Sequence, residues 1–562
     1  MRPMDSSHST PDWTNTKTIV DLFFRRVDHC GDREALFFRS GESFVAVSWQ
    51  TLGEEVRRGA SMLVELGVQP GQHVIQISEN RYEWILFDLA IQLCGAVHVP
   101  IHATLSANQI AFQIIDSGAQ LVILSSATLY QEMRPLLDDC FHNIRWLFLD
   151  VLPQTSHSQN IYLRHELADR LAADRKSYEH QASENDAATI LYTSGTTGEP
   201  KGVVLTHDNL ISNTFGILTD NRQEPEDLRL SLLPWSHIFA RTCDIYCWIA
   251  SGCQLAIAEN REKILDNCRE LKPTLLNAVP YFFDKLYQTL ADKDATETPG
   301  SLNQLLGGRI RVCCSGGAAL PAHVEELFSH QQIALLSGYG LTETSPVITI
   351  STLKENRRGT VGKPLRDVEI RIAADGEILT RGPHIMKGYY NNPIATTEVI
   401  RDGWLHTGDL GTLSDDGYLT ITGRKKEMIV LSTGKNVSPV NIELMLVDIP
   451  LILRAFVLGN DRSSLAALIV PNPKVLRGEI IHRSIAVSSP EEACSHPQIM
   501  ELYRSALAER LKTLASHEQI HKFRLLDRDF NTEMGELTPT LKLRRDIIRK
   551  NFEVEISAMY AS

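Results

Sequence analysis

The sequence has no long, uninterrupted hydrophobic run. In its 562 residues, the stretch from 84 to 104 comes closest, and Asp88, His98 and Pro100 interrupt it. A membrane-spanning helix needs about 20 consecutive apolar residues, so this stretch fits a buried helix that leads into a strand. Residues 1–11 also lack the apolar segment of a secretory signal. We therefore expect a cytoplasmic protein that is not exported.

Cysteine is scarce, and its spacing does not fit a metal site. Of the ten cysteines, Cys243, Cys247 and Cys253 lie closest to a cluster, but their spacing is uneven and their neighbours are apolar. Structural zinc sites usually use paired ligands such as Cys-x-x-Cys, and disulfides are rare in reducing compartments. We expect free, buried thiols.

Positive charge is also in deficit. Lysine and arginine total 56 against 69 aspartates and glutamates, which gives a formal net charge of −13. Proteins that bind nucleic acid through its phosphates are usually basic, so no nucleic-acid partner is expected. An acidic protein that binds polyphosphate must gather its cations locally.

The composition, 43% apolar and 22% charged, is that of an ordinary globular protein. At 562 residues, the chain is too long for a single hydrophobic core. Between residues 74 and 125, strand-like and helix-like patterns alternate, which predicts an α/β fold with a mainly parallel sheet. The expected strands are 74–77, 96–101 and 121–125, and the expected helices are 82–93 and 107–116.

The pattern changes after residue 355 to short strands joined by turns such as Asp375-Gly376. We expect a large N-terminal domain over residues 1–423, made of layered α/β sheets and closed by this β-rich subdomain. The last stretch, residues 424–562, has the size of a separate small α+β domain.

The stretch 191–203, Leu-Tyr-Thr-Ser-Gly-Thr-Thr-Gly-Glu-Pro-Lys-Gly-Val, organises the chain. A short apolar strand precedes a loop of glycines and hydroxyls that ends at a lysine. Glycines let backbone N–H groups converge on an anion, and the hydroxyls and lysine add donors. The order differs from the common nucleotide loop, Gly, four residues, Gly-Lys-Ser/Thr, but it still predicts a polyphosphate site. Its candidate ligands are Thr193, Ser194, Gly195, Thr196, Thr197, Gly198 and Lys201.

This loop closely resembles the phosphate-binding loop of the adenylate-forming superfamily, which includes acyl-CoA synthetases, luciferases and peptide-synthetase adenylation domains. Within it, the stretches Leu-Pro-Trp-Ser-His-Ile-Phe-Ala-Arg at 233–241 and Asp-Gly-Trp-Leu-His-Thr-Gly-Asp-Leu-Gly at 402–411 most resemble long-chain fatty acyl-CoA synthetases. Further matching stretches are Ser-Gly-Gly-Ala-Ala at 315–319, Tyr-Gly-Leu-Thr-Glu-Thr at 339–344 and Gly-Glu-Leu-Thr-Pro-Thr-Leu-Lys-Leu-Arg-Arg at 535–545. The resemblance covers residues from about 18 to 550.

The resemblance implies a nucleotide site. Thr342 would bind the α-phosphate, and Glu343, together with Thr193, would hold Mg²⁺. Asp409 would accept hydrogen bonds from the ribose hydroxyls, and Arg424 would reach the ribose or phosphate. The adenine would lie against Gly316, Gly317, Ala318, Tyr339 and Gly340.

The resemblance also implies a catalytic set and a mobile C-terminal domain. Lys542 matches the catalytic lysine, and Thr342, Glu343 and His237 complete the set. Lys426 matches the hinge about which the small domain changes position between two half-reactions. Gly434 and Lys435 would then face a channel for CoA.

The implied activity converts a long-chain fatty acid to acyl-AMP with ATP and Mg²⁺, and then transfers the acyl group to CoA. Two alternatives stay open: a ligase that loads a carrier protein in trans, and a nucleotide-binding regulator without catalysis. Trp235 stands where a smaller aliphatic residue is usual in these synthetases, which leaves the chain-length preference open. The basic run around Lys542 predicts peripheral contact with anionic lipid. The oligomeric state is open, with a homodimer as one prediction.

Overall fold

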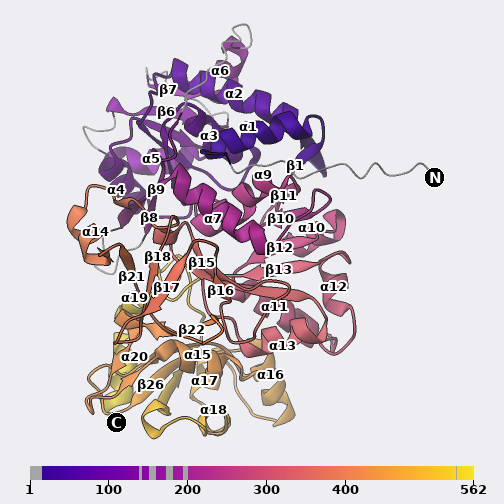
Figure 1. The fold of residues 1–562 in the computed structure, drawn as a ribbon. Coiled ribbons are helices and arrows are strands. Elements are labelled where there is room, and N and C mark those ends of the chain that lie inside the picture. Colours follow the sequence, from indigo (N-terminus) through magenta and orange to yellow (C-terminus); the bar gives the residue numbers. More distant parts are fainter. Residues whose placement is uncertain are drawn as a thin grey trace.

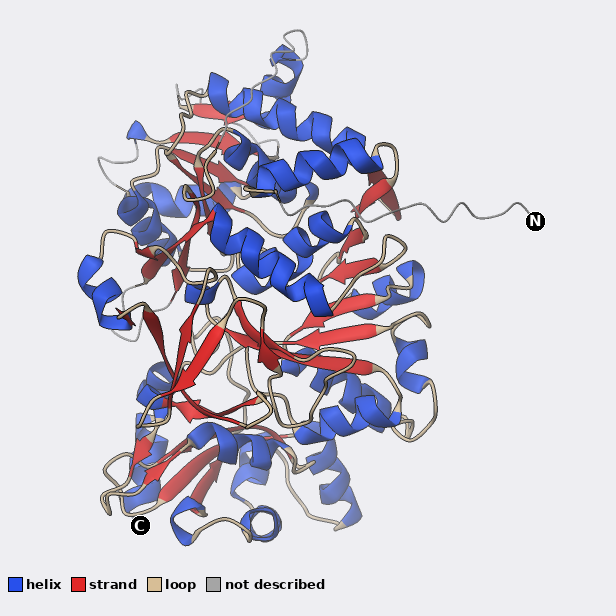
Figure 2. Ribbon diagram, viewed as in Figure 1, coloured by secondary structure: helices blue, strands red, loops and turns tan. Residues whose placement is uncertain are grey.

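The computed structural model describes residues 15–137, 142–150, 160–171, 182–193, 200–538 and 541–561. Figure 1 shows layers of helices and strands in the upper part of the molecule and a separate group of elements, late in the chain, at the bottom. Coloured by secondary structure, the same view shows helices packed against strands at both ends and a strand-rich region between them (Figure 2). The predicted α/β class is confirmed.

One sheet of the large N-terminal part has the strand order β19-β9-β8-β4-β3-β5-β6-β7. Its strands are β3 (His73–Ile77), β4 (Val97–Ile101), β5 (Leu121–Leu124), β6 (Arg145–Phe148), β7 (Ile161–Leu163), β8 (Ala187–Thr193), β9 (Lys201–Thr206) and β19 (Gly388–Tyr389). The strands from β8 to β7 pair in parallel, whereas β8 and β9 are antiparallel. The predicted phosphate loop therefore joins two adjacent strands, with Thr193 directly opposite Lys201.

The two helices expected at 82–93 and 107–116 are present in this region as α3 and α4. Helix α1 begins after Thr18, whose hydroxyl accepts a hydrogen bond from the N–H of Asp21 at 3.1 Å, a typical N-cap. Helices α2 and α3 pack tightly because Gly59 lacks a side chain; a Cβ there would lie 2.6 Å from Leu86. The helices are α1 (Ile19–Cys30), α2 (Trp49–Glu65), α3 (Tyr82–Leu93), α4 (Ala107–Ser117), α5 (Ala127–Met133) and α6 (Arg164–Leu171).

A second sheet has the order β16-β15-β14-β13-β12-β10-β11-β1-β2. Its five central strands, β14, β13, β12, β10 and β11, pair in parallel. The strands are β1 (Glu34–Ser40), β2 (Ser43–Ser48), β10 (Leu228–Ser231), β11 (Gln254–Ile257), β12 (Leu275–Ala278), β13 (Val312–Ser315), β14 (Ala334–Gly340), β15 (Val347–Ile350) and β16 (Lys363–Pro364). Parallel strands place their carboxyl ends at one edge, where open α/β sheets bind ligands. The stretches that begin at Ser315 and Tyr339 therefore lie side by side.

The helices that accompany this sheet include one irregular segment. A π-helical turn, Arg241–Tyr246, joins α8 to α9, and such turns often occur at functional sites. The helices are α7 (His207–Asp220), α8 (Ile238–Ala240), α9 (Cys247–Ser251), α10 (Ile264–Leu271), α11 (Pro280–Ala291), α12 (Ser301–Leu305) and α13 (Ala322–His330).

The β-rich region lies where the change of pattern predicts it. It comprises β17 (Glu369–Ile372), β18 (Glu377–Arg381), β20 (Ile400–Arg401), β21 (Trp404–Leu413), β22 (Leu419–Arg424) and helix α14 (Pro393–Val399). Strands β21 and β22 are antiparallel, with Asp409 directly opposite Arg424.

The C-terminal part is built on the sheet β25-β26-β27. Every residue of β26 is buried, and alternate side chains enter two separate apolar clusters, one on each face of the sheet. The strands are β23 (Ile429–Val430), β24 (Asn436–Val437), β25 (Ile452–Leu458), β26 (Leu465–Pro471) and β27 (Ile520–Leu525). The helices are α15 (Pro439–Val447), α16 (Pro473–His482), α17 (Pro490–Ser495), α18 (Pro497–Leu511), α19 (Arg545–Asn551) and α20 (Glu553–Ala561).

Three elements lie where the sequence pattern gives no helix or strand. Residues 151–186 have the composition of a polar surface excursion, yet the described part of them contains β7 and α6. Leu167 is the only buried residue of α6, so its sequence carries no apolar stripe that would signal a helix. Helix α12 likewise lies within a stretch, 291–304, that reads as a loop.

The structure also describes the state of the cysteines and the length of the apolar helices. Every cysteine that the structure describes is free, and most are buried. Among the described helices, none is long and apolar enough to cross a membrane.

Candidate active site

A cavity of about 1550 Å³ lies between the strand ends of the second sheet, the β-rich region and the C-terminal part. Its walls bring together motifs that are hundreds of residues apart in the sequence. The predicted site residues that line it are Thr193, Lys201, His237, Gly316, Gly317, Tyr339, Gly340, Thr342, Glu343, Arg424, Lys426 and Lys542.

Other predicted residues lie elsewhere. Ala318 is exposed outside the cavity, and Gly434 and Lys435 are exposed in the turn between β23 and β24. Asp409 contacts two residues that line the cavity, Tyr339 and Arg424. Ser194, Gly195, Thr196, Thr197 and Gly198 lie outside the described residues.

Asp409 forms the centre of a polar group at the predicted ribose site. Arg424 Nε donates to its Oδ1 at 2.7 Å, and the hydroxyl of Tyr339 donates to its Oδ2 at 2.8 Å. Burial alone would lower the pKa of Arg424, but the Asp409 carboxylate outweighs burial and raises it. Each carboxylate oxygen has a second lone pair, so Asp409 retains the capacity to accept two further hydroxyl donors.

Glu343 lies on the turn that follows β14, and its Oε1 accepts a hydrogen bond from the hydroxyl of Tyr389 at 2.8 Å. The ammonium group of Lys201 lies 5.2 Å from the centre of the same Tyr389 ring. The described residues contain no cluster of three or more acidic, histidine or cysteine side chains that would hold a metal alone. Mg²⁺ at nucleotide sites commonly takes one or two protein oxygens and completes its shell with phosphate and water, so Glu343 and Thr193 fit such an ion.

Lys542 reaches the cavity from the C-terminal part. Its Cε lies 3.9 Å from the position that a Cβ on Gly317 would occupy. Its ammonium group has no recorded hydrogen bond or ion pair within the described part of the chain. Lys542 is exposed to the cavity. Desolvation by the surrounding walls, and then the positive charge of Arg424, lower the pKa of Lys542. The charge of this lysine is therefore available to a ligand.

Two histidines line the same wall, and sequence reasoning found only one of them. His237 Nδ1 accepts a hydrogen bond from the N–H of Phe239 at 3.2 Å, and His102 Nδ1 lies 2.6 Å from the hydroxyl of Ser236. Burial lowers the pKa of His102 to about 4, and burial with the charge of Lys542 lowers that of His237 to about 3. Both rings are therefore neutral near pH 7. The position of His102 directly after the parallel strand β4 is the signal that could have identified it.

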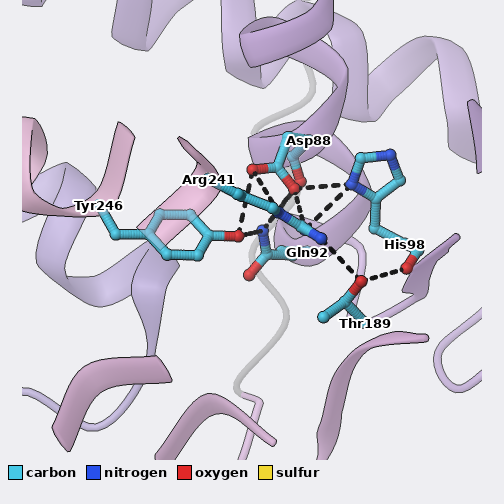
Figure 3. A network of polar contacts seen from close by, with 6 residues as sticks. All are labelled: Asp88, Gln92, His98, Thr189, Arg241 and Tyr246. Carbon is cyan, nitrogen blue, oxygen red and sulfur yellow. Dashed lines mark hydrogen bonds and ion pairs between the residues drawn. The ribbon is translucent and has the colours of Figure 1, made fainter. Parts of the chain in front are cut away.

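A buried polar network holds the segments behind this wall (Figure 3). Arg241 pairs with Asp88, neither of which has any exposed side-chain surface. Arg241 Nη1 also donates to the hydroxyl of Thr189 at 2.7 Å, and that hydroxyl donates to the carbonyl of His98 at 2.7 Å. Burial alone would raise the pKa of Asp88, but Arg241 outweighs burial and holds it at about 2.

The position of this network explains its importance for the cavity. Thr189 lies on β8, which leads into the predicted phosphate loop, and Arg241 begins the π-helical turn after His237. Arg241, held by its ion pair with Asp88, therefore links two elements that carry site residues through its hydrogen bond to Thr189.

Two family models match successive parts of this chain. The AMP-binding enzyme family matches residues 23–390, and the C-terminal domain of AMP-binding enzymes matches residues 426–562. The chain belongs to the AMP-binding enzyme family.

This AMP-binding enzyme is 34% identical, over 557 aligned positions, to long-chain-fatty-acid–CoA ligase FadD15 of Mycobacterium bovis, covering 90% of this chain and 91% of the relative. FadD15 of Mycobacterium tuberculosis gives the same identity and coverage. The solved structure of the anthranilate CoA ligase AuaEII has the same fold, with a TM-score of 0.78 and 21% identity over 96% of this chain and 98% of that one. The resemblance to long-chain fatty acyl-CoA synthetases is confirmed.

The cavity of this AMP-binding enzyme also has apolar lining residues beside the polar ones already described. They include Ile217, Cys243, Leu336, Val347 and Ile350. The Trp235 side chain is fully buried, donates to Ser231 and does not line the cavity.

Proposed function

We propose that this AMP-binding enzyme is a long-chain fatty acid–CoA ligase. It joins a fatty acid to AMP at the expense of ATP, releases pyrophosphate, and then transfers the acyl group to the thiol of CoA. The observation that carries the proposal is the position of Lys542. Lys542 lines the same cavity as the nucleotide-motif residues Tyr339 and Glu343 and as apolar side chains such as Leu336.

In the first half-reaction, a carboxylate oxygen attacks the α-phosphorus of ATP, and the bond between that phosphorus and the pyrophosphate oxygen breaks. Two anions must approach, so catalysis depends on fixed positive charge and donors near the developing charge. Lys542 supplies the charge, and the neutral rings of His237 and His102 can supply N–H donors without titrating near pH 7. Mg²⁺ held by Glu343 and Thr193 would offset the phosphate charge.

The nucleotide itself is bound by other residues that line or contact the cavity. Asp409 accepts from the ribose hydroxyls, with its orientation fixed by Arg424 and Tyr339. Gly316 and Gly317 line the wall with no side chain, which leaves room for a flat base. Lys201, opposite Thr193 on the β8–β9 pair, faces the phosphates.

The acyl chain packs against the apolar part of the cavity lining, which includes Ile217, Leu336, Val347 and Ile350. The 34% identity to long-chain-fatty-acid–CoA ligase FadD15 supports a long-chain substrate.

In the second half-reaction, the CoA sulfur attacks the acyl carbon, loses its proton, and AMP departs. We propose that residues 424–562 act as a mobile domain that turns about Lys426 between the two steps, and that Gly434 and Lys435 then face the CoA channel. The arrangement in which Lys542 enters the cavity, with Gly434 and Lys435 outside it, fits the first step.

Membrane contact and a homodimer stay predictions. The basic run offers little charge for an anionic surface. Lys542 faces the cavity, and Arg545 pairs with Glu427 and Glu443 inside the C-terminal part.

The test supplies ATP, Mg²⁺, palmitate and CoA to the purified protein and measures AMP and palmitoyl-CoA. Equal amounts of both products are expected. Palmitoyl-AMP without thioester would instead indicate a ligase that loads a carrier protein. Absence of palmitate-dependent pyrophosphate exchange into ATP would indicate a non-catalytic nucleotide-binding protein.

A further inference from the structure

One histidine lies between carboxylates from both sides of the junction between the large and C-terminal parts. His323, on α13, places Nε2 at 2.6 Å from Oδ1 of Asp284 on α11. Its Nδ1 lies 2.9 Å from Oδ1 of Asp448, which ends α15 of the C-terminal part. We propose that His323 is a positioning residue for acyl-AMP formation: as an imidazolium, it bridges Asp284 and Asp448 and holds the C-terminal part where Lys542 enters the cavity.

The chemistry of the bridge requires the charged ring. Ionised carboxylates only accept hydrogen bonds, so a ring with a carboxylate at each nitrogen must donate from both and is an imidazolium. The side chains of His323, Asp284 and Asp448 are 15%, 11% and 14% exposed, so water screens the contacts only in part. Burial alone would lower the pKa of His323, but the two carboxylates outweigh burial and raise it to about 9.

The surroundings of the bridge fix its geometry. The ring of Tyr287, one turn after Asp284 on α11, lies 4.5 Å from the imidazole, centre to centre. Arg510 of α18 pairs with the other oxygen of Asp448 and also donates to the carbonyl of Met445 at 3.0 Å. Asp448 is therefore held toward His323 by its own domain.

The β25–β27 sheet connects the His323 bridge with Lys542. Helix α15, which ends at Asp448, packs on one face of the β25–β27 sheet, and Leu537, Leu541 and Leu543 pack on the other face. A fixed position for Asp448 therefore constrains the position of Lys542.

Other contacts across the junction have a different character. The Lys474–Asp292 pair is largely exposed, and exposed pairs contribute little. Arg454 lies over the ring of Tyr281 at 4.7 Å, a contact without a fixed hydrogen-bond direction. Compared with these two contacts, the His323 bridge specifies one arrangement by charge and direction together.

The inference rests on the proposed function, because it assigns the bridge to one of two half-reactions. When the C-terminal part turns away for thioester formation, His323 keeps Asp284 but loses Asp448. Removal of the bridge should therefore slow only the step that needs Lys542 in the cavity. Couplings of this kind usually change a population by roughly 5- to 150-fold, and for this partly exposed bridge we expect about tenfold.

The experiment measures both half-reactions in single turnover for the full chain. Acyl-AMP formation is followed from ATP, Mg²⁺ and palmitate, and thioester formation from synthetic palmitoyl-AMP and CoA. His323→Gln is expected to slow acyl-AMP formation about tenfold and to leave thioester formation unchanged. His323→Lys, which keeps a positive charge between the carboxylates, should recover part of the loss.

The matched control is His330→Gln on the same helix. His330 is exposed, and its nearest recorded carboxylate, Glu297 at 3.7 Å, lies in the same large part. Both half-reactions of this variant should equal those of the wild type. Asp448→Asn supplies a second variant with the same expected asymmetry in case His323→Gln folds poorly.

The pH dependence of acyl-AMP formation is a further measurement, and a purely structural role of His323 would not affect it. The rate ratio of wild type to His323→Gln in acyl-AMP formation cancels the titration of Lys542, which both proteins share. This ratio should be about ten near pH 7 and approach one as pH rises above the His323 pKa of about 9. Equal losses in both half-reactions, or no loss in either, overturn the inference. A wild type that forms no acyl-AMP overturns the proposed function instead.

Discussion

Replacement of Lys542 by alanine separates the two half-reactions most sharply. The ammonium group has no recorded partner among the described residues, so its removal leaves no buried charge unpaired. The variant should fold normally and lose only the interaction with the reacting groups. Loss of one preorganised donor usually costs about 2.7–4 kcal/mol, or 10²–10³ in rate, and we expect this loss in acyl-AMP formation.

The assay pairs single-turnover acyl-AMP formation with thioester formation from synthetic palmitoyl-AMP and CoA, where Lys542→Ala should be near normal. Lys550→Ala, an exposed lysine on the nearby helix α19, is the control and should match the wild type in both steps. An independent signal is the pKa of His237, about 3 in the wild type, which should rise when the Lys542 charge is removed and can be followed by NMR. Equal losses in both half-reactions would refute the role of this lysine.

Three further predictions follow from other parts of the site. Asp409→Ala should weaken ATP binding by roughly 3–6 kcal/mol, since two hydroxyl bonds to a carboxylate are each worth about 1.5–3 kcal/mol; calorimetry that finds unchanged affinity would contradict the ribose assignment. Arg241→Met should lower the free energy of unfolding by about 3–5 kcal/mol, because it leaves Asp88 charged and buried; a urea midpoint equal to that of the wild type would contradict this. Across saturated acids from acetate to stearate, kcat/KM should rise with chain length and peak at about twelve or more carbons, because each buried methylene contributes about 0.8 kcal/mol of favourable free energy. A peak at hexanoate or shorter would exclude the long-chain assignment.

Local patterns predicted much of the fold. Helix α3 spans Tyr82–Leu93 as expected, because its apolar residues stop at a glycine-containing turn. The short apolar strand expected before the phosphate loop is present as β8. Helix α6 was missed because a helix without an apolar face gives no periodic signal.

The motif residues of the site were predicted from the resemblance to the adenylate-forming superfamily, and two of the motifs, at Ser315 and Tyr339, lie at strand ends that the sheet topology brings together. Contacts between distant segments were not predictable in this way. His102 and Ser236 are separated by 134 residues, and His323 and Asp448 by 125. Only the packing of whole layers brings these pairs together, and no local spacing encodes that packing.

The antiparallel pairing of β8 and β9 also determines how the phosphate loop can vary. Thr193 and Lys201 face each other across the ladder, and β9 pairs on its other edge with β19, which carries Tyr389. The loop between them can gain residues while its two ends stay in place. A one-residue deletion within β9, by contrast, would turn Lys201 to the opposite face of the sheet. For an engineer who wishes to alter phosphate binding, the loop is therefore the part to diversify, and the strand that follows it is the part to keep unchanged.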